Sequence, residues 1–367
     1  MPNHAPFNRR DLLKLAGTSA ASLTVGGFFP QSPPFFGFSD AELIRVTTSG
    51  LKAQGVPVYA KPTDESAIVR MAFRDDLLTL YDVVDSGTPA YNPVWYRVWG
   101  GYINRERTQR VSPILNGISS SIRENGQLAE VTVPYTQAIR KTWDEKWELM
   151  NRLYYTSVHW VVGVELGPDS RLWYSVLDEL TDITYLVVPE HLRLIPDSEI
   201  APLSPEVPWE EKFIKVSLSS QRVSAYEYGK EVFSTIISSG RLDTSPGPNG
   251  VATITPTGKF HINVKMPSKH MGSGDLASAS DVEAYQLPGV PWVSFIQFDD
   301  RKFQGHAFHG TYWHDNFGVP MSSGCINMVS EEAKWLFRWC YPTAAADQIS
   351  PQTLDVRGYG TPGEVVA

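Results

Sequence analysis

Cysteine is scarce in this chain of 367 residues, which contains two, Cys325 and Cys340. Two cysteines leave no structural zinc arrangement of the usual kind, and we expect neither a metal nor a cofactor. Basic blocks are missing too: charged residues make up 20% of the chain, the two signs are interspersed, and the net charge is −8. Without a basic stripe the chain lacks the electrostatic footprint of nucleic-acid binding, so we expect no DNA or RNA partner.

Long apolar runs are absent beyond the N-terminus, where nothing approaches the ~20 apolar residues of a membrane-spanning helix. What the chain does contain is 42% hydrophobic and 12% aromatic residues. That composition is ample for ordinary buried cores, and the length predicts two or three domains.

The first 40 residues read as an export signal followed by a proline-rich linker. Arg9 and Arg10 precede a weakly apolar run rich in Gly, Ala, Ser and Thr, which resembles a twin-arginine signal. The alternative is an amphipathic first helix of the mature protein. Export predicts a protein of the cell envelope, in the periplasm or the cell wall, with no stable membrane span afterwards.

Short β-rich runs separated by Pro, Gly, Asp and Ser fill residues 41–112, a pattern typical of a small antiparallel barrel. The segment resembles a bacterial SH3-type module. The residues that carry this resemblance lie in its closing strands: Trp95, Tyr96, Gly101, Tyr102 and Ile103.

A related pattern returns over residues 113–205, where Trp173 and Tyr174 repeat the earlier Trp-Tyr pair. We interpret this as a second, diverged SH3-like module in which the charged stretch 140–152 is an inserted helix. The alternative is one larger β domain with coincidental pairs.

Residues 206–367 change character. From Lys212 to Gly240 apolar and polar residues alternate at period two around the turn "YGKE", which predicts a strand hairpin. Residues 290–298, "VPWVSFIQF", predict a buried strand. Ser330, Glu331 and Glu332 precede "AKWLFRWC", which predicts a helix with a serine N-cap and two acids in its first turn.

Cys325 raises the question of nucleophilic chemistry. A cysteine reacts as thiolate, so its pKa of roughly 8.5 must be lowered by a nearby histidine, a cation or a helix N-terminus. His306, His309 and His314 are candidates, and each lies too far before Cys325 to share a helix turn with it, so adjacent strands or loops must bring them together. On a strand His306 and His309 would face opposite sides. "SSGC" offers backbone N–H donors with little side-chain bulk.

These residues resemble a known family. "HGT", a spacer and "SSGCINM", preceded by "TPTGKF" and the hairpin, are similar to the catalytic domain of the L,D-transpeptidases, the YkuD-type domain, from about Phe213 to the C-terminal strand. The fold expected is therefore mainly β: two small SH3-like barrels, then a β-sandwich catalytic domain with a short helix.

The resemblance implies roles for single residues. Cys325 would be the acylated nucleophile, His309 the general base, and the Gly310 carbonyl would orient the imidazole. The N–H groups of Ser323, Gly324 and Cys325 would form the oxyanion hole. Ser323 stands where the family usually has a second histidine. The residues expected to contact substrate are Tyr312, Trp313, Ser322, Asn327 and Met271.

Several of these residues have an alternative interpretation as structural residues. Tyr312 and Trp313 are either core aromatics or walls of the donor groove, and Met271 belongs to either a lid or a surface loop. His306 and His314 are expected to be structural. Cys340 is expected to pack in a core, since a Cys325–Cys340 disulfide would block the nucleophile.

By resemblance, the function is that of an exported, monomeric L,D-transpeptidase in peptidoglycan biosynthesis. Cys325 would attack a donor tetrapeptide stem, release terminal D-alanine, and pass the acyl group to an acceptor stem as a 3→3 cross-link. Alternatives are an L,D-carboxypeptidase that uses water, or a weakly active or non-catalytic wall-binding protein, suggested by Ser323. A papain-like peptidase is disfavoured because its cysteine precedes its histidine.

Overall fold

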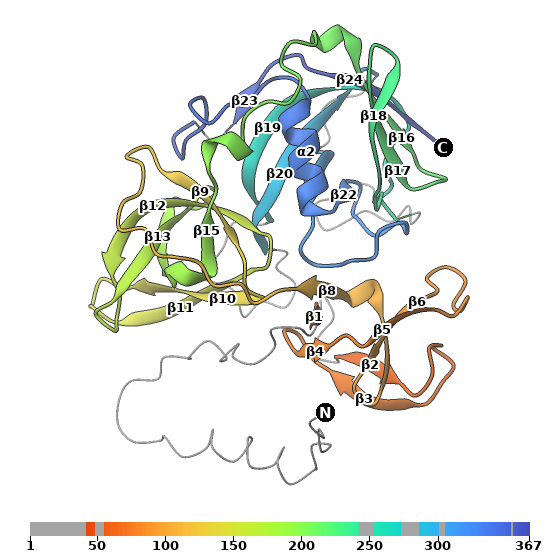
Figure 1. The fold of residues 1–367 in the computed structure, drawn as a ribbon, viewed down its shortest axis with the longest axis horizontal. Helices are drawn as coiled ribbons and strands as arrows, with labels where there is room; N and C mark the ends of the chain where they lie inside the picture. The colour runs from red at the N-terminus through yellow and green to blue at the C-terminus, as the bar shows by residue number, and fades with distance from the viewer. Residues whose placement is uncertain (1–41, 48–54, 242–252, 273–285, 301–304, 354) are drawn as a thin grey trace, which may run out of the picture. The chain divides into compact units, whose positions relative to one another are not determined.

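The structure, a computed structural model, describes residues 42–47, 55–241, 253–272, 286–300, 305–353 and 355–367. The predicted export signal and linker lie outside these residues. Among the described residues, none forms a helix of the length and apolarity that membrane crossing requires. The described chain is mainly β, as expected, with one α-helix (Figure 1).

The first module consists of short antiparallel strands in two sheets, of order β4-β1-β8 and β3-β2-β7-β6-β5. Both sheets contribute to one small core that includes Ile44, Val58, Tyr96 and Ile103. The predicted short strands are present, and the SH3 likeness stays a prediction. The elements are β1 (Leu43–Val46), β2 (Val56–Tyr59), β3 (Ile68–Ala72), β4 (Leu77–Thr79), β5 (Asp82–Asp85), β6 (Val94–Val98), β7 (Gly101–Asn104), the 3-10 turn η2 (Arg105–Arg107) and β8 (Thr108–Val111).

The predicted second module contains a seven-stranded antiparallel sheet of order β11-β10-β14-β13-β12-β9-β15, and its standing as a separate module stays a prediction. Its elements are β9 (Gln127–Val131), β10 (Tyr135–Lys141), β11 (Trp147–Tyr154), β12 (Val158–Leu166), β13 (Leu172–Asp178), β14 (Ile183–Val187), β15 (Leu192–Leu194) and the 3-10 turns η3 (Pro189–His191) and η4 (Asp197–Glu199).

The helix predicted for residues 140–152 is wrong, because this stretch is the β10–β11 hairpin. The Thr142 hydroxyl donates to Asp144 at 2.5 Å and accepts the Lys146 N–H at 3.1 Å, and Glu145 has a φ of 65°. Local hydrogen bonds of this kind compete with helix formation, and they close a tight turn here instead.

The third domain is built on a sheet of order β18-β17-β16-β24-β19-β20-β21-β22, with β23 paired to β19. The predicted hairpin and buried strand are confirmed as β16 to β18 and β20. The elements are the 3-10 turn η5 (Trp209–Glu211), β16 (Lys212–Ser217), β17 (Arg222–Glu227), β18 (Lys230–Ile236), β19 (Gly258–Gly272), β20 (Gln286–Phe298), β21 (Ala307–Gly310), β22 (Ile326–Met328), α2 (Ser330–Trp339), β23 (Val356–Arg357) and β24 (Pro362–Val366).

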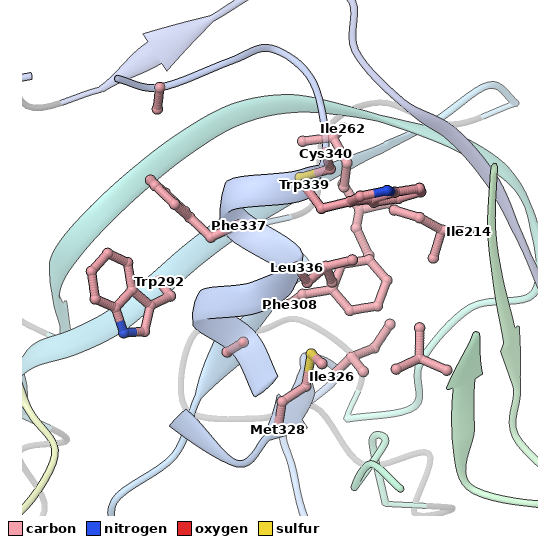
Figure 2. Packing of buried hydrophobic residues seen from close by; sticks show 14 of the residues in the cluster. Ile214, Ile262, Trp292, Phe308, Ile326, Met328, Leu336, Phe337, Trp339 and Cys340 are labelled. Carbon is pink, nitrogen blue, oxygen red and sulfur yellow. The ribbon is translucent and has the colours of Figure 1, made fainter. Parts of the chain in front are cut away.

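Helix α2 packs its apolar face against the sheet. Leu336, Phe337 and Trp339 are buried together with Phe308 and Ile326 of the two short strands (Figure 2). The helix begins right after β22, so its packing fixes the end of that strand.

The predicted serine cap of α2 is wrong. Val329 is the N-cap and no side chain caps the helix, while Ser330 is its first residue and donates to the Thr156 hydroxyl at 3.0 Å. Glu331 and Glu332 lie in the first turn, as expected, where the helix dipole favours acids.

Two buried lysines close the other end of α2. Lys212 Nζ donates to Trp339 O at 2.9 Å, and Lys265 Nζ donates to Cys340 O at 2.8 Å. Burial lowers the pKa of Lys265 to about 8, so it remains mostly charged at pH 7. These cations satisfy carbonyls that a helix end leaves without partners and complement its dipole. Cys340 is fully buried among them, as expected, and both cysteines are free thiols.

The second module should lose stability in acid. Burial lowers the pKa of His159 to about 3 and that of His191 to about 4, below the ordinary 6.5. The unfolded chain therefore takes up protons first, so stability is complete above pH 6.5 and falls towards pH 4, by about 1.4 kcal/mol per pH unit for each histidine. Urea unfolding at pH 7, 6, 5 and 4 measures this slope.

The variant His191→Gln is the control for that slope. It removes one of the histidines whose pKa burial lowers, so its free energy of unfolding should fall less steeply between pH 6.5 and 4. A slope equal to that of the unaltered protein would contradict the assignment.

Candidate active site

Strands β21 and β22 bring the candidate base and nucleophile together. They pair in parallel, with His309 opposite Asn327. Cys325 precedes Asn327 by two positions at the entrance to β22. Cys325 thus lies in the bend just before β22, one residue ahead of Ile326, which pairs with Phe308 beside His309.

The His309 ring is oriented by the backbone. Its Nδ1 lies 2.9 Å from the Gly310 carbonyl oxygen, so Nδ1 carries the proton and donates it there. Burial lowers the pKa of His309 to about 4, and the Gly310 carbonyl opposes this only in part. At neutral pH the ring is therefore neutral, with the lone pair of Nε2 available to accept a proton.

The Cys325 thiol is partly buried and donates to the Gly305 carbonyl at 3.8 Å. Burial raises its pKa to about 11, although the Ala307 N–H acts in the opposite direction. The lowered pKa expected from the sequence is therefore not observed, because His309 is itself neutral and supplies no positive charge. The resting pair is a neutral thiol and a neutral imidazole.

The turn before Cys325 is held by side-chain hydroxyls. Gly324 has a φ of 111°, in the region that favours glycine. Ser322 Oγ donates to Cys325 O at 2.5 Å and accepts the Gly324 N–H at 3.1 Å. Thr255 Oγ1 donates to Gly324 O at 2.9 Å. Ser322, expected to contact substrate, instead fixes the nucleophile turn.

This geometry corrects the predicted oxyanion hole. The Gly324 N–H is already used by Ser322, so it is not available to an oxyanion. The Ser323 and Cys325 N–H groups remain as candidate donors. Ser323 is exposed, and its replacement of the usual histidine leaves the backbone N–H in place.

Several residues that hold this turn belong to none of the predicted site residues. Ser239 O accepts the N–H groups of Met321 at 2.9 Å and Ser322 at 3.0 Å, and Ser238 exchanges backbone hydrogen bonds with Asn327. Thr255 did carry a signal, since it opens the "TPTGKF" stretch. The serines end an ordinary-looking strand and carried none.

The predicted substrate-contact residues differ in their surroundings. Tyr312 is 1% exposed and its hydroxyl donates to Pro288 O at 2.9 Å, so it belongs to the core rather than to the donor groove. Trp313 is partly exposed, with its ring centroid 5.6 Å from that of His309. Met271 lies at the end of β19 and packs on the same small cluster as Cys325.

The other two histidines are buried. His306 has its ring beside Phe298, at a centroid distance of 5.9 Å. His314 lies beside Asn327 and is kept neutral by burial, which lowers its pKa to about 3. Within the described residues no cluster of three His, Cys, Asp or Glu side chains is arranged to hold a metal ion.

Comparison with known proteins gives a family match over most of the third domain. Residues 211–364 match the YkuD family, the L,D-transpeptidase catalytic domain, and this range contains both His309 and Cys325. No curated protein matches the chain.

Solved structures of L,D-transpeptidases are similar to this chain, but at low sequence identity and low TM-score. A cysteine-to-serine mutant of the Enterococcus faecium L,D-transpeptidase is 22% identical over 42% of this chain and 50% of its own, with a TM-score of 0.29. L,D-transpeptidase 3 from Mycobacterium tuberculosis is 18% identical over 51% of this chain and 75% of its own, with a TM-score of 0.30. The chain thus spans about half the length of the first of these proteins.

The neutral thiol predicts a particular pH profile for alkylation. Because burial holds the pKa of Cys325 at about 11, its thiolate fraction should still rise about tenfold per pH unit at pH 9. Iodoacetamide labelling of Cys325, followed by mass spectrometry from pH 5 to 10, measures this. A plateau reached below pH 7 would instead indicate a preformed thiolate–imidazolium pair.

Gly310 should not tolerate a side chain. A Cβ there would lie 2.7 Å from Pro291 Cγ and 2.9 Å from Ser330 Cα, so Gly310→Ala should push β21 away from α2. We expect a loss of about 1–3 kcal/mol in the free energy of unfolding, together with lower activity. The matched control is Gly117→Ala, where a Cβ would meet nothing within 4 Å. Equal melting temperatures for the two variants would disprove this account.

Proposed function

We propose that this protein is an exported cysteine L,D-transpeptidase that forms 3→3 cross-links between peptidoglycan stem peptides. The observation that carries the proposal is the pairing of His309 with Asn327 across β21 and β22, two residues from Cys325, with the imidazole oriented by the Gly310 carbonyl. The match of residues 211–364 to the L,D-transpeptidase catalytic domain supports the substrate class.

The first half-reaction transfers the stem to the enzyme. His309 Nε2 takes the thiol proton while Cys325 Sγ attacks the carbonyl carbon of the diamino acid in a tetrapeptide stem. The neutral resting pair means that proton transfer accompanies the attack rather than preceding it. The tetrahedral intermediate then collapses, the bond to D-alanine breaks, and its nitrogen takes the proton from the imidazolium. The tripeptide remains as a thioester.

The second half-reaction forms the cross-link. The side-chain amine of a second stem's diamino acid attacks the thioester carbon and gives a proton to His309 Nε2. Collapse of the intermediate breaks the carbon–sulfur bond, and the proton returns to Cys325 Sγ. Water in place of the amine would make the same enzyme an L,D-carboxypeptidase.

Oxyanion stabilisation in this scheme falls to two backbone groups. The Ser323 and Cys325 N–H groups flank the nucleophile, and removing one such donor costs on the order of 10²–10³ in rate in enzymes of this type. Ser323 contributes its backbone N–H. This donor is present whether the side chain at this position is serine or the histidine usual in the family. This favours an active enzyme over a decayed wall-binding protein.

The test is release of D-alanine from a disaccharide tetrapeptide, followed by mass spectrometry for the cross-linked dimer. We expect both products from the unaltered protein and neither from Cys325→Ala, because the thioester cannot form. Cys340→Ala is the control, since that thiol is buried in the core and should leave turnover in place. Release undiminished in Cys325→Ala would overturn the proposal, and release without dimer would assign the carboxypeptidase.

A further inference from the structure

The loop at 311–318, which follows His309 and Gly310 and leads towards the Cys325 turn, is bound by the first module. Arg45, which is 2% exposed, donates from Nη2 to Tyr312 O at 2.8 Å. Thr47 Oγ1 donates to Trp313 O at 2.6 Å. Two successive loop carbonyls are thus held by side chains from the start of the described chain.

Strand β8 continues the contact through its backbone. The Asp315 N–H donates to Thr108 O at 2.9 Å, and the Arg110 N–H donates to the Asp315 carboxylate. These bonds join residues about 200 positions apart in sequence. The loop is therefore packed against the first module rather than projecting freely.

Arg105, in the turn η2, binds two consecutive residues of the loop. Its Nε donates to Asn316 Oδ1 at 3.0 Å and its Nη2 donates to Phe317 O at 2.9 Å. A planar guanidinium holds two acceptors in a fixed relation to each other, which a lysine ammonium cannot do.

Asn316 is fully buried and uses both its backbone and its side-chain groups. Its N–H donates to His314 Nδ1 at 3.1 Å, and its carbonyl accepts from Ser238 Oγ at 3.0 Å. Its Nδ2 lies 3.3 Å from Met321 Sδ, at the start of the nucleophile turn. Arg105 occupies the remaining acceptor, Oδ1, so the residue is fixed on all sides.

His314 passes this constraint to the strand of the nucleophile. Its Nδ1 accepts a backbone N–H and the ring is neutral, so the ring proton is on Nε2. Asn327 Nδ2 and His314 Nε2 lie 2.8 Å apart, and two donors cannot face each other. The amide orientation that satisfies the pair turns Asn327 Oδ1 towards His314.

Asn327 is 1% exposed, pairs with His309 and follows Cys325 by two residues. One end of its side-chain amide has no hydrogen-bond partner among the described residues. In the orientation set by His314 that end is the NH₂ group, a donor at the position where the sequence predicts a substrate contact.

We propose that Arg105 is a positioning residue for acyl transfer. It acts through Asn316 and His314 on Asn327. In this way it keeps β22, and the Cys325 thiol just before that strand, in register with His309. The first module is then part of the active site and not only a spacer or wall anchor. The effect on turnover rests on the proposed function, whereas the effect on the thiol does not.

The test compares Arg105→Ala with Arg107→Ala. Arg107 lies on the same turn, is 36% exposed in its side chain, and its nearest acid is Glu106 at 4.0 Å, so it is a matched arginine outside the relay. For each variant of the full chain, Cys325 is labelled with iodoacetamide across pH 6–10. The melting temperature of the variant and its rate of D-alanine release are measured as well.

Loss of the relay should have two opposite effects. With β22 loosened, water reaches the thiol and its pKa falls towards about 8.5, so labelling at pH 8 should rise about tenfold or more. The kcat for D-alanine release should fall about tenfold with KM changed less than twofold, because the reacting atoms are misplaced. Arg107→Ala should match the unaltered protein in both.

Cys340 reports on a merely structural effect. It is fully buried under α2, so it should stay unlabelled in Arg105→Ala. Equal labelling of both cysteines would mean general loosening and would overturn the proposal, as would an unchanged Cys325 profile. If Arg105→Ala does not fold, Arg105→Lys is used in its place. Lysine keeps the charge but cannot make both hydrogen bonds, so the pH profile of Cys325 labelling should shift towards lower pH by less than expected for Arg105→Ala.

The double variant Arg105→Ala/Asn316→Ala tests the route. Residues in one relay are non-additive, so the double variant should label as fast as Arg105→Ala alone. Additive effects would contradict the route through Asn316. If the unaltered protein releases no D-alanine while Arg105→Ala still shifts the labelling profile, the proposed function fails and the relay stands.

Discussion

The parallel pairing of β21 and β22 is the constraint on which the site depends. Parallel neighbours cannot be joined by a tight hairpin, so the chain needs a long connection between His309 and Cys325. That connection carries Trp313, His314 and Asn316, and its residues 311–321 form no helix or strand. Hydrogen bonds from Arg45, Thr47 and Arg105 supply the definition that a regular element would otherwise give.

Burial sets the protonation of the site. Desolvation raises the pKa of the Cys325 thiol and lowers that of the His309 imidazole, so both favour the uncharged form. A charged pair would have to be stabilised by further groups in the site, and the site offers mainly backbone N–H and C=O groups. In the proposed reaction, charge therefore develops only during the attack, when the forming imidazolium and oxyanion would stabilise each other.

The sequence was sufficient where chemistry or periodicity is local. The contact of the His309 ring with the Gly310 carbonyl, the hairpin after Lys212 and the buried strand β20 could all be predicted. It was insufficient where contacts with distant parts of the chain determine the position of a side chain. Tyr312 and Trp313 are adjacent aromatic residues, yet Tyr312 lies in the core and Trp313 lies beside His309. Charge at 140–152 suggested a helix, but the hydrogen bonds of Thr142 closed a hairpin. The contact of Arg105 with Asn316 joins distant segments and leaves no local pattern.

The two lysines at the end of α2 have a consequence for assembly. Lys212 comes from β16 and Lys265 from β19, and the strand that separates these two in the sheet is β24. The spacing of the two ammonium groups that bind the end of α2 is therefore set by a strand that follows the helix in sequence. Docking of the helix is thereby coupled to the insertion of β24 between β16 and β19.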